Sequence, residues 1–504
     1  MITIVDCGSQ LTQNIKRRIQ EQEVRAEIVP HRASLDDILS GSPQGIIQSG
    51  GQASVYDDGP PLPDARIYAA GVPVLGICFG MQAMAHLLGG RVQAAKNREY
   101  GKTRIHLKDS PLFTGIESKE ITVWMSHGDI IEQVPPGFEV IAVSENGHPA
   151  AMQKGNLYAV QFHPEVDHTE YGRQMLQNFL AACNARQDWR QGDMAENIIA
   201  EVQRQAGENT VIGGVSGGVD STTMSVLMHR AIGERYHALF IDNGLLRMEE
   251  REEVAGYLSA LGINLHVTDA SPRFLERLAG VDDPDLKRKI IGNEFIAVFE
   301  EEAARIGDIG YLCQGTLYPD VIESIPVHGA SSRIKRHHNV GGLPERMRLQ
   351  LIEPFRYLFK DEVRKIAEQL GMPEEIVWRH PFPGPGLAVR IKGEVTAEKL
   401  ALVRQADRIF ISEMRQQGFY RQVSQAFAAL SADQTVGVMG DGHTYQHACV
   451  LRAVVTRDFM TADSFYFPQE FEQRVTSRIV NEVKGINRVY WDKTQKPPGT
   501  IELE

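Results

Sequence analysis

The sequence has no long apolar run and few cysteines, and both absences narrow what the protein can be. Nowhere does an apolar run approach the roughly eighteen residues of a membrane-spanning helix. The start, MITIVDCGSQ, has a short apolar run without basic residues before it, unlike a secretory signal. The five cysteines are too scattered for a disulfide framework or a metal cluster: Cys7, Cys78, Cys183, Cys313 and Cys449. We therefore expect a cytoplasmic protein with free thiols and no membrane partner.

An excess of basic residues is also missing. The chain has 53 Lys and Arg against 65 Asp and Glu, a net charge of −12, so we expect no nucleic-acid partner. The basic run RIKRHH at 333–338 is the stretch that suggests RNA, and the acidic whole argues against that interpretation. With 504 residues the chain is too long for one core, and typical domain sizes suggest about three domains.

The pattern of apolar runs predicts an α/β fold. Short apolar runs alternate with helical patterns over residues 1–183, which is typical of a doubly wound domain. The strand candidates there are 2–5, 45–50, 72–78, 123–128, 138–144 and 157–163. A second α/β pattern begins near Thr210, and prolines and glycines at 380–386 exclude a helix or central strand. We expect two doubly wound α/β domains, at 1–186 and 187–379, and a small α+β domain at 380–504.

The motif GICFGMQ at 76–82 places Cys78 directly after an apolar run, with Gly76 and Gly80 two residues to either side. This spacing is typical of a tight strand-to-helix turn that exposes a nucleophile. At the N-terminus of the following helix, the dipole and free amides would favour the thiolate over the thiol. A buried cysteine beside packing glycines is the alternative for this motif alone.

A second motif, QFHPEV at 161–166, supplies a partner for this cysteine. His163 and Glu165 are two residues apart, so on an extended segment both side chains point the same way. Glu165 would orient His163, which would take a proton from Cys78. A surface turn is the alternative for HPE in isolation. Candidates for the oxyanion and glutamine contacts are Gly50, Gly51, Phe79 and Gln82. Together these motifs resemble the class I glutamine amidotransferases, which implies a Cys78–His163–Glu165 triad that hydrolyses glutamine.

The loop GGVSGGVDSTT at 213–223 looks like a phosphate-binding loop without its lysine. It follows an apolar run and opens a helical pattern, as an anion site at a helix N-terminus requires. The loop resembles the PP-loop of ATP pyrophosphatases, which cleave ATP between the α- and β-phosphates and transfer AMP to an oxygen. The resemblance implies ATP contacts from Ser216, Gly217, Gly218, Val219, Asp220 and Ser221. Asp220 is the candidate ligand for Mg²⁺ that accompanies ATP. A glycine-rich turn before a helix is the alternative.

Further motifs narrow the substrate. The stretches 288–295, 314–324, 337–344, 379–390 and 496–504, in this domain order, resemble the GMP synthetase family over essentially the full chain. The resemblance implies xanthosine monophosphate (XMP) as substrate beside ATP and glutamine, and a homodimer. It also implies XMP contacts from Arg288, Lys496 and Glu502. The roles of Asp320, Glu323, Lys335 and Arg336 stay open.

Two other functions compete with this one. The first is another glutamine-dependent adenylating synthetase of the PP-loop class, for example one that amidates a small acid or an NAD precursor. The second is a nucleotide-binding protein with degenerate sites, which the intact catalytic motifs disfavour.

Overall fold

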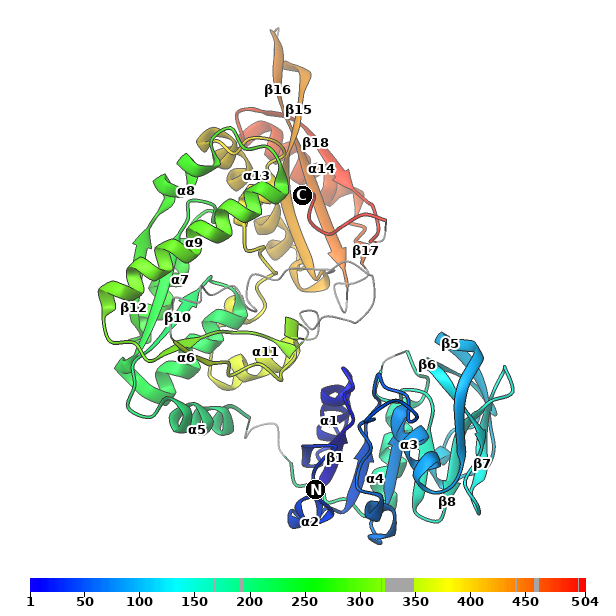
Figure 1. The fold of residues 1–504 in the computed structure, drawn as a ribbon. Coiled ribbons are helices and arrows are strands. Elements are labelled where there is room, and N and C mark those ends of the chain that lie inside the picture. Colours follow the sequence, from blue (N-terminus) through cyan, green and yellow to red (C-terminus); the bar gives the residue numbers. More distant parts are fainter. Residues whose placement is uncertain are drawn as a thin grey trace. The chain divides into compact units, whose positions relative to one another are not determined.

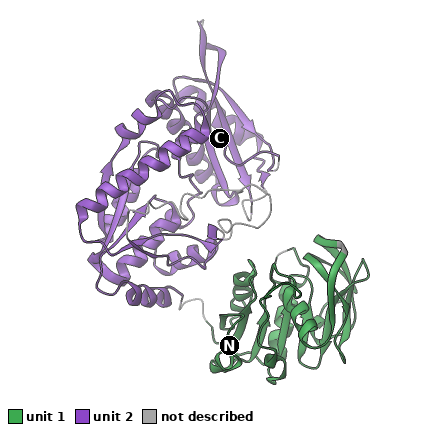
Figure 2. Cartoon of the chain, in the orientation of Figure 1, with its two compact units in different colours: residues 1–191 green, residues 192–504 purple. Residues whose placement is uncertain are grey.

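A computed structural model describes residues 1–166, 168–189, 194–318, 320–321, 349–439, 442–456, 462–496 and 498–504. The chain divides into two units, residues 1–191 and 192–504, and each unit is described by itself (Figure 2). Within the described residues, none of the helices combines the length and apolar character needed to cross a bilayer.

The first unit is built on a nine-stranded sheet, in the order β2-β1-β3-β4-β9-β8-β7-β5-β6. The first five strands in this order are parallel: β2 (Ala26–Pro30), β1 (Ile2–Asp6), β3 (Gly45–Gln48), β4 (Val74–Ile77) and β9 (Leu157–Val160). The last four are antiparallel: β8 (Pro149–Lys154), β7 (Glu139–Ser144), β5 (Arg91–Leu107) and β6 (Glu120–Gln133). Four of the parallel strands, β1, β3, β4 and β9, are buried along nearly their whole length, as strands covered by helices on two sides are, whereas in the edge strand β2 only Ala26 is buried.

Helices cover both faces of the parallel strands. On one face, α1 (Thr12–Gln20) and α4 (Gly172–Ala182) share a buried cluster with Ile2 and Ile4 of β1. On the other face, α2 (Leu35–Ser40) and α3 (Phe79–Leu87) pack in a second cluster with Val5 of β1. Successive side chains of β1 therefore feed two separate cores, which confirms the predicted α/β class for this part of the chain.

The second unit contains a five-stranded parallel sheet in the order β12-β11-β10-β13-β14. Its strands are β10 (Val211–Val215), β11 (Tyr236–Asp242), β12 (Asn264–Asp269), β13 (Tyr311–Cys313) and β14 (Gln350–Ile352). One face packs against α5 (Met194–Ala206), α6 (Val219–Ile232), α7 (Glu250–Ala260) and α11 (Lys360–Gln369). The other face packs against α8 (Ser271–Leu278) and α9 (Pro284–Ile306), and α12 (Glu374–Val377) follows α11.

The last part of the second unit is α+β. Strands β15 (Gln425–Met439), β16 (Gly442–Val455) and β17 (Asp463–Ser464) are antiparallel, and β18 (Ile486–Asp492) pairs with β16 in parallel. Helices α13 (Ala397–Gln416) and α14 (Gln469–Glu482) accompany them, and the β15–β16 hairpin extends beyond the sheet (Figure 1). One buried cluster joins these helices to α8 and α9. The domain boundary predicted at 379/380 stays a prediction, because residues 192–504 form one compact unit.

Candidate active sites

The upstream cysteine lies at a sharp turn between β4 and α3. Cys78 has φ 54° and ψ −106°, a backbone conformation that non-glycine residues rarely adopt. A Cβ on Gly76 would lie 2.6 Å from the Gly80 carbonyl oxygen, and one on Gly80 would lie 2.6 Å from the Gln48 carbonyl oxygen. Both glycines are therefore required sterically, and the tight turn that the sequence predicts is present.

His163 and Glu165 lie against this turn. Nδ1 of His163 is 2.7 Å from Oε1 of Glu165, and their side chains are 5% and 0% exposed. Cys78 lies beside His163, because a Cβ on Gly50 would be 3.2 Å from Cε1 of His163 and 3.5 Å from Cβ of Cys78. The structure therefore brings together all three residues that the sequence singles out. Nε of Arg18 donates to the Glu165 carbonyl oxygen over 3.0 Å, which ties α1 to this segment.

The negative charges around His163 favour its protonated form. Burial lowers the pKa of His163, but the negative charges of Glu165 and of a Cys78 thiolate together raise it by more. The pKa of His163 therefore lies well above its usual value. The imidazolium is therefore the favoured form beside a thiolate.

The other four cysteines are buried as well, without such a partner. Burial, together with the nearby Asp6 charge, raises the pKa of Cys7 to about 12, and burial raises that of Cys183 to about 12. Burial also raises the pKa of Cys313 and of Cys449. These thiols stay protonated near neutral pH, so they are poor nucleophiles.

The predicted oxyanion and glutamine candidates surround the turn. A Cβ on Gly50 would lie 3.2 Å from Cε1 of His163 and 3.5 Å from Cβ of Cys78, so this backbone passes directly beside the pair. Gly51 lies against the Phe79 ring in the same way. Nε2 of Gln82 donates to the Asp129 carbonyl oxygen over 3.2 Å. One contact was not evident from the sequence, the 3.8 Å approach of the Cys78 sulfur to the Ser126 carbonyl oxygen.

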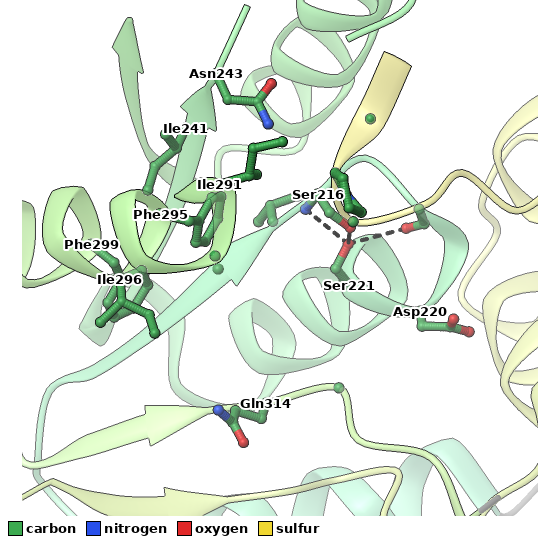
Figure 3. Close-up of a pocket in the computed structure, with 18 of the residues that line it drawn as sticks. Ser216, Asp220, Ser221, Ile241, Asn243, Ile291, Phe295, Ile296, Phe299 and Gln314 are labelled. Carbon is green, nitrogen blue, oxygen red and sulfur yellow. Dashed lines mark hydrogen bonds between the residues drawn. The ribbon is translucent and has the colours of Figure 1, made fainter. Parts of the chain in front are cut away.

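The glycine-rich loop of the second unit connects β10 to α6, as predicted. Gly217 has φ +78°, and Gly218 is the N-cap of α6. Oγ of Ser221 accepts from the Ser216 amide over 3.1 Å and lies 3.0 Å from Oγ of Ser216, and Figure 3 shows these bonds. Val219 and Asp220 form the first turn of α6, where amides without helical partners face outward. The loop therefore presents amides and hydroxyls to an anion.

This loop borders a cavity of about 480 Å³, a size usual for small-molecule sites. Ser216, Gly218, Asp220 and Ser221 form its polar end. Its apolar side carries Ile241, Ile291, Phe295 and Phe299 (Figure 3). Two further parts of the wall are segment 382–386 and residues 312–317, which begin within β13 and continue beyond its end. A polar end beside an apolar slot suits a ligand with a phosphate at one end and a flat, weakly polar group at the other.

The comparisons with known proteins match different families to the part of the chain with the cysteine site and to the part with the glycine-rich loop. The family model "Glutamine amidotransferase class-I" matches residues 3–183, "NAD synthase" matches 193–284, and "GMP synthase C terminal domain" matches 412–503. A "GMP synthase [glutamine-hydrolyzing]" of Aquifex aeolicus is 54% identical over 507 residues, 100% of this chain and 99% of the relative. Proteins of the same name from Carboxydothermus hydrogenoformans and Thermus thermophilus are 53% and 51% identical, covering 100% of this chain and 99% and 100% of theirs.

The chain belongs to the family of glutamine-hydrolysing GMP synthases. The match to the "NAD synthase" model covers only the segment around the loop. GMP synthases, in contrast, align from end to end, and a GMP synthase C-terminal domain follows the loop. These matches decide between the GMP synthase and the NAD-type alternative that the loop alone leaves open.

The residues predicted to contact XMP in this GMP synthase family member do not all meet at the cavity. Among the described residues, the cavity lining includes Arg288 of α9 but neither Lys496 nor Glu502. The Glu502 carboxylate accepts from Nε and Nη2 of Arg390 over 3.1 and 2.9 Å, and from Gln425 over 2.6 Å. The backbone of Lys496 pairs with Ala462. Their nucleotide contacts therefore stay predictions.

A cation near the loop was missed by sequence reasoning. Nζ of Lys360, the first residue of α11, lies 3.4 Å from Oδ2 of Asp220. No local motif marks Lys360, because only the folded sheet brings α11 beside α6. Asp320 lines the cavity, whereas Glu323, Lys335 and Arg336 lie outside the described residues.

The side chain of Asp220 also fits a cation. Its Oδ1 atom is buried and makes no hydrogen bond to any described residue, and a buried carboxylate oxygen without a partner is costly unless a ligand satisfies it. Oxygen ligands of this kind are those that Mg²⁺ prefers, usually together with substrate phosphates. The described residues contain no group of three or more His, Cys, Asp or Glu side chains that would hold a metal by themselves.

Proposed function

We propose that this protein makes GMP from XMP, ATP and glutamine and releases AMP, pyrophosphate and glutamate. The observation that carries the proposal is the combination, in one chain, of a buried Cys78–His163–Glu165 arrangement and a lysine-free phosphate loop. End-to-end relatives named as glutamine-hydrolysing GMP synthases support it. We assign residues 1–186 to glutamine hydrolysis, 187–379 to ATP cleavage, and 380–504 to dimerisation and nucleotide contacts.

In the first unit, the Cys78 thiolate attacks the side-chain amide of glutamine. His163 then donates its proton to the departing ammonia, and Glu165 holds the imidazolium in place. The Gly50 and Gly51 segment and the Phe79 amide at the start of α3 are the candidates that stabilise the oxyanion. Water then hydrolyses the thioester to glutamate, with His163 acting as the base.

In the second unit, the loop amides with Ser216 and Ser221 hold the departing pyrophosphate. In other phosphate-binding loops, a lysine of the loop itself neutralises phosphate charge. We assign this role to Lys360, because its Nζ lies 3.4 Å from Asp220 at the edge of the loop. Asp220 would hold Mg²⁺, which supplies charge neutralisation for the phosphates when bound. The purine oxygen of XMP attacks the α-phosphate of ATP, which transfers AMP to this oxygen and releases pyrophosphate. Ammonia then displaces AMP, which is a better leaving group than oxide or hydroxide.

The proposal also covers the nucleotide contacts and the assembly. We propose that Arg288, on the cavity wall, contacts XMP, and that Lys496 and Glu502 approach it from the C-terminal tail. A cytoplasmic homodimer suits the third region, since the β15–β16 hairpin exposes apolar side chains that a partner would cover. These are Val436, Val438 and Tyr445, which are 59%, 70% and 67% exposed.

The test is AMP release from ATP in the presence of ammonium and one purine monophosphate at a time. With XMP we expect AMP and GMP in equal amounts, and with inosine monophosphate no AMP above background. AMP release that depends instead on a small carboxylic acid would favour the other PP-loop amide synthetase and contradict the proposal.

A further inference from the structure

Arg379 opens the stretch RHPFPGPG, and the functional sites described above do not explain why an arginine stands there. Its Nη1 donates to the Gly217 carbonyl oxygen over 3.2 Å and to Oε1 of Glu250 over 3.2 Å. Its Nη2 donates to Oε2 of Glu253 over 2.6 Å, and the side chain is only 10% exposed. One guanidinium thus links the phosphate loop to the start of α7.

The bond to Gly217 fixes the direction of one loop amide. In a trans peptide, the carbonyl of Gly217 and the N–H of Gly218 point in opposite directions. Gly218 lines the cavity, whereas Arg379 is not among the described residues that do so. Arg379 therefore holds the Gly217 carbonyl without lining the cavity, which leaves the opposite N–H of this peptide, that of Gly218, available to a ligand there.

A glycine-rich loop needs a contact that fixes the orientation of its peptides. Gly217 has φ +78°, and glycine adopts positive and negative φ about equally well. Rotation of the peptide between Gly217 and Gly218 would turn a carbonyl oxygen toward the bound phosphate, where two negative groups would repel each other. On the other side of the loop, Ser221 bonds the Ser216 amide, but that bond leaves the Gly217 carbonyl unrestrained.

The charge of Arg379 is already matched by its protein partners. Glu250 and Glu253 both pair with it, and the Glu250 side chain is 4% exposed. The guanidinium therefore serves as a rigid donor fork between three acceptors, a geometry that lysine cannot reproduce.

We propose that Arg379 is a positioning residue that locks the Gly217–Gly218 peptide in its phosphate-binding orientation. The proposal rests on the assignment of the loop as the pyrophosphate site. The cavity wall at 382–386 begins three residues after Arg379, so the same segment contacts both the cavity and the loop.

The test is the affinity of the full-length protein for pyrophosphate with Mg²⁺, measured by titration calorimetry. Arg379→Met should weaken binding about tenfold to a hundredfold, the range expected for a lost hydrogen bond to a charged group. Arg379→Lys should recover only part of this loss. Arg305→Met, which removes an exposed arginine paired with Glu302 on α9, is the control and should leave the affinity unchanged.

Loss of Arg379 also removes the guanidinium that pairs with the buried Glu250 carboxylate, which is expected to destabilise the fold. The double variant Arg379→Met with Glu250→Gln removes that charge, so it should recover thermal stability while pyrophosphate binding stays weak. Stability and affinity that recover together, or an unchanged affinity in Arg379→Met, would overturn the proposal. A wild-type protein that fails to bind pyrophosphate would instead overturn the assignment of the loop.

Discussion

Cys78→Ala is expected to abolish GMP synthesis with glutamine and to leave synthesis with ammonium chloride intact. Loss of an enzyme's nucleophile typically lowers the rate by several orders of magnitude, so we expect a fall of more than about a thousandfold with glutamine. The second unit needs only ammonia, and mildly alkaline pH raises the free base. The measurement is GMP formation with each nitrogen source at equal enzyme concentration.

Cys183→Ala is the matched control for this experiment. Cys183 is buried in the same unit, and burial raises its pKa to about 12, so its loss removes a packing thiol but no nucleophile. We expect this variant to keep glutamine-dependent synthesis. Retained glutamine use by Cys78→Ala would show that the cysteine only packs in the turn, and loss with both nitrogen sources would show that the substitution damages more than glutamine hydrolysis.

Asp220→Ala is expected to abolish synthesis with either nitrogen source. The substitution removes the unpartnered buried oxygen that fits Mg²⁺ and leaves the Lys360 ammonium without its carboxylate. We expect GMP formation to fall by more than about a hundredfold. Rates are measured at saturating XMP, ATP and ammonium.

Asp308→Ala controls for the loss of a carboxylate, since Asp308 is exposed after α9 and does not line the cavity beside the loop. Alkylation of Cys78 by iodoacetamide should proceed at the wild-type rate in both variants, because the nucleophile lies in the other unit. Near-normal GMP formation by Asp220→Ala would contradict the assignment of the loop.

The two motifs could be predicted from the sequence because their geometry is local. At 76–80, the chain turns from strand to helix within a few residues, and a Cβ on Gly76 would meet the Gly80 carbonyl of the same turn. The loop at 216–221 is likewise defined by the strand before it and the helix after it. In both places, the residues that the backbone geometry requires are neighbours in the sequence, so the motif itself predicts the geometry.

Long-range partners could not be predicted in this way. Lys360 comes beside Asp220 only through the packing of α11 near α6. Three strands of the first unit were also not predicted. Strands β5 and β8 lie in the antiparallel part of the sheet, and β2 is the edge strand of the parallel part, where Glu27 and Pro30 are exposed. Antiparallel sheets tolerate one solvated face, which weakens the apolar signal that the strand predictions depended on.

The contacts of the tail at 496–504 likewise could not be predicted from local sequence. The family resemblance predicts that Lys496 and Glu502 contact the nucleotide. In the structure, two tail carboxylates pair with fully buried cations, Glu502 with Arg390 and Glu504 with Lys287. A buried cation is identified only by what covers it, so this anchoring function has no local signature.

The central claim is that the lysine-free loop serves transfer of AMP to the purine of XMP. The most direct measurement uses XMP labelled with oxygen-18 at its 2-oxo group, together with ATP and ammonium, and mass spectrometry of all products. The proposed mechanism predicts that the label appears in the phosphate group of AMP, in equal amount to GMP, and not in pyrophosphate or water. Unlabelled AMP, with the isotope in pyrophosphate or released to solvent, would contradict it.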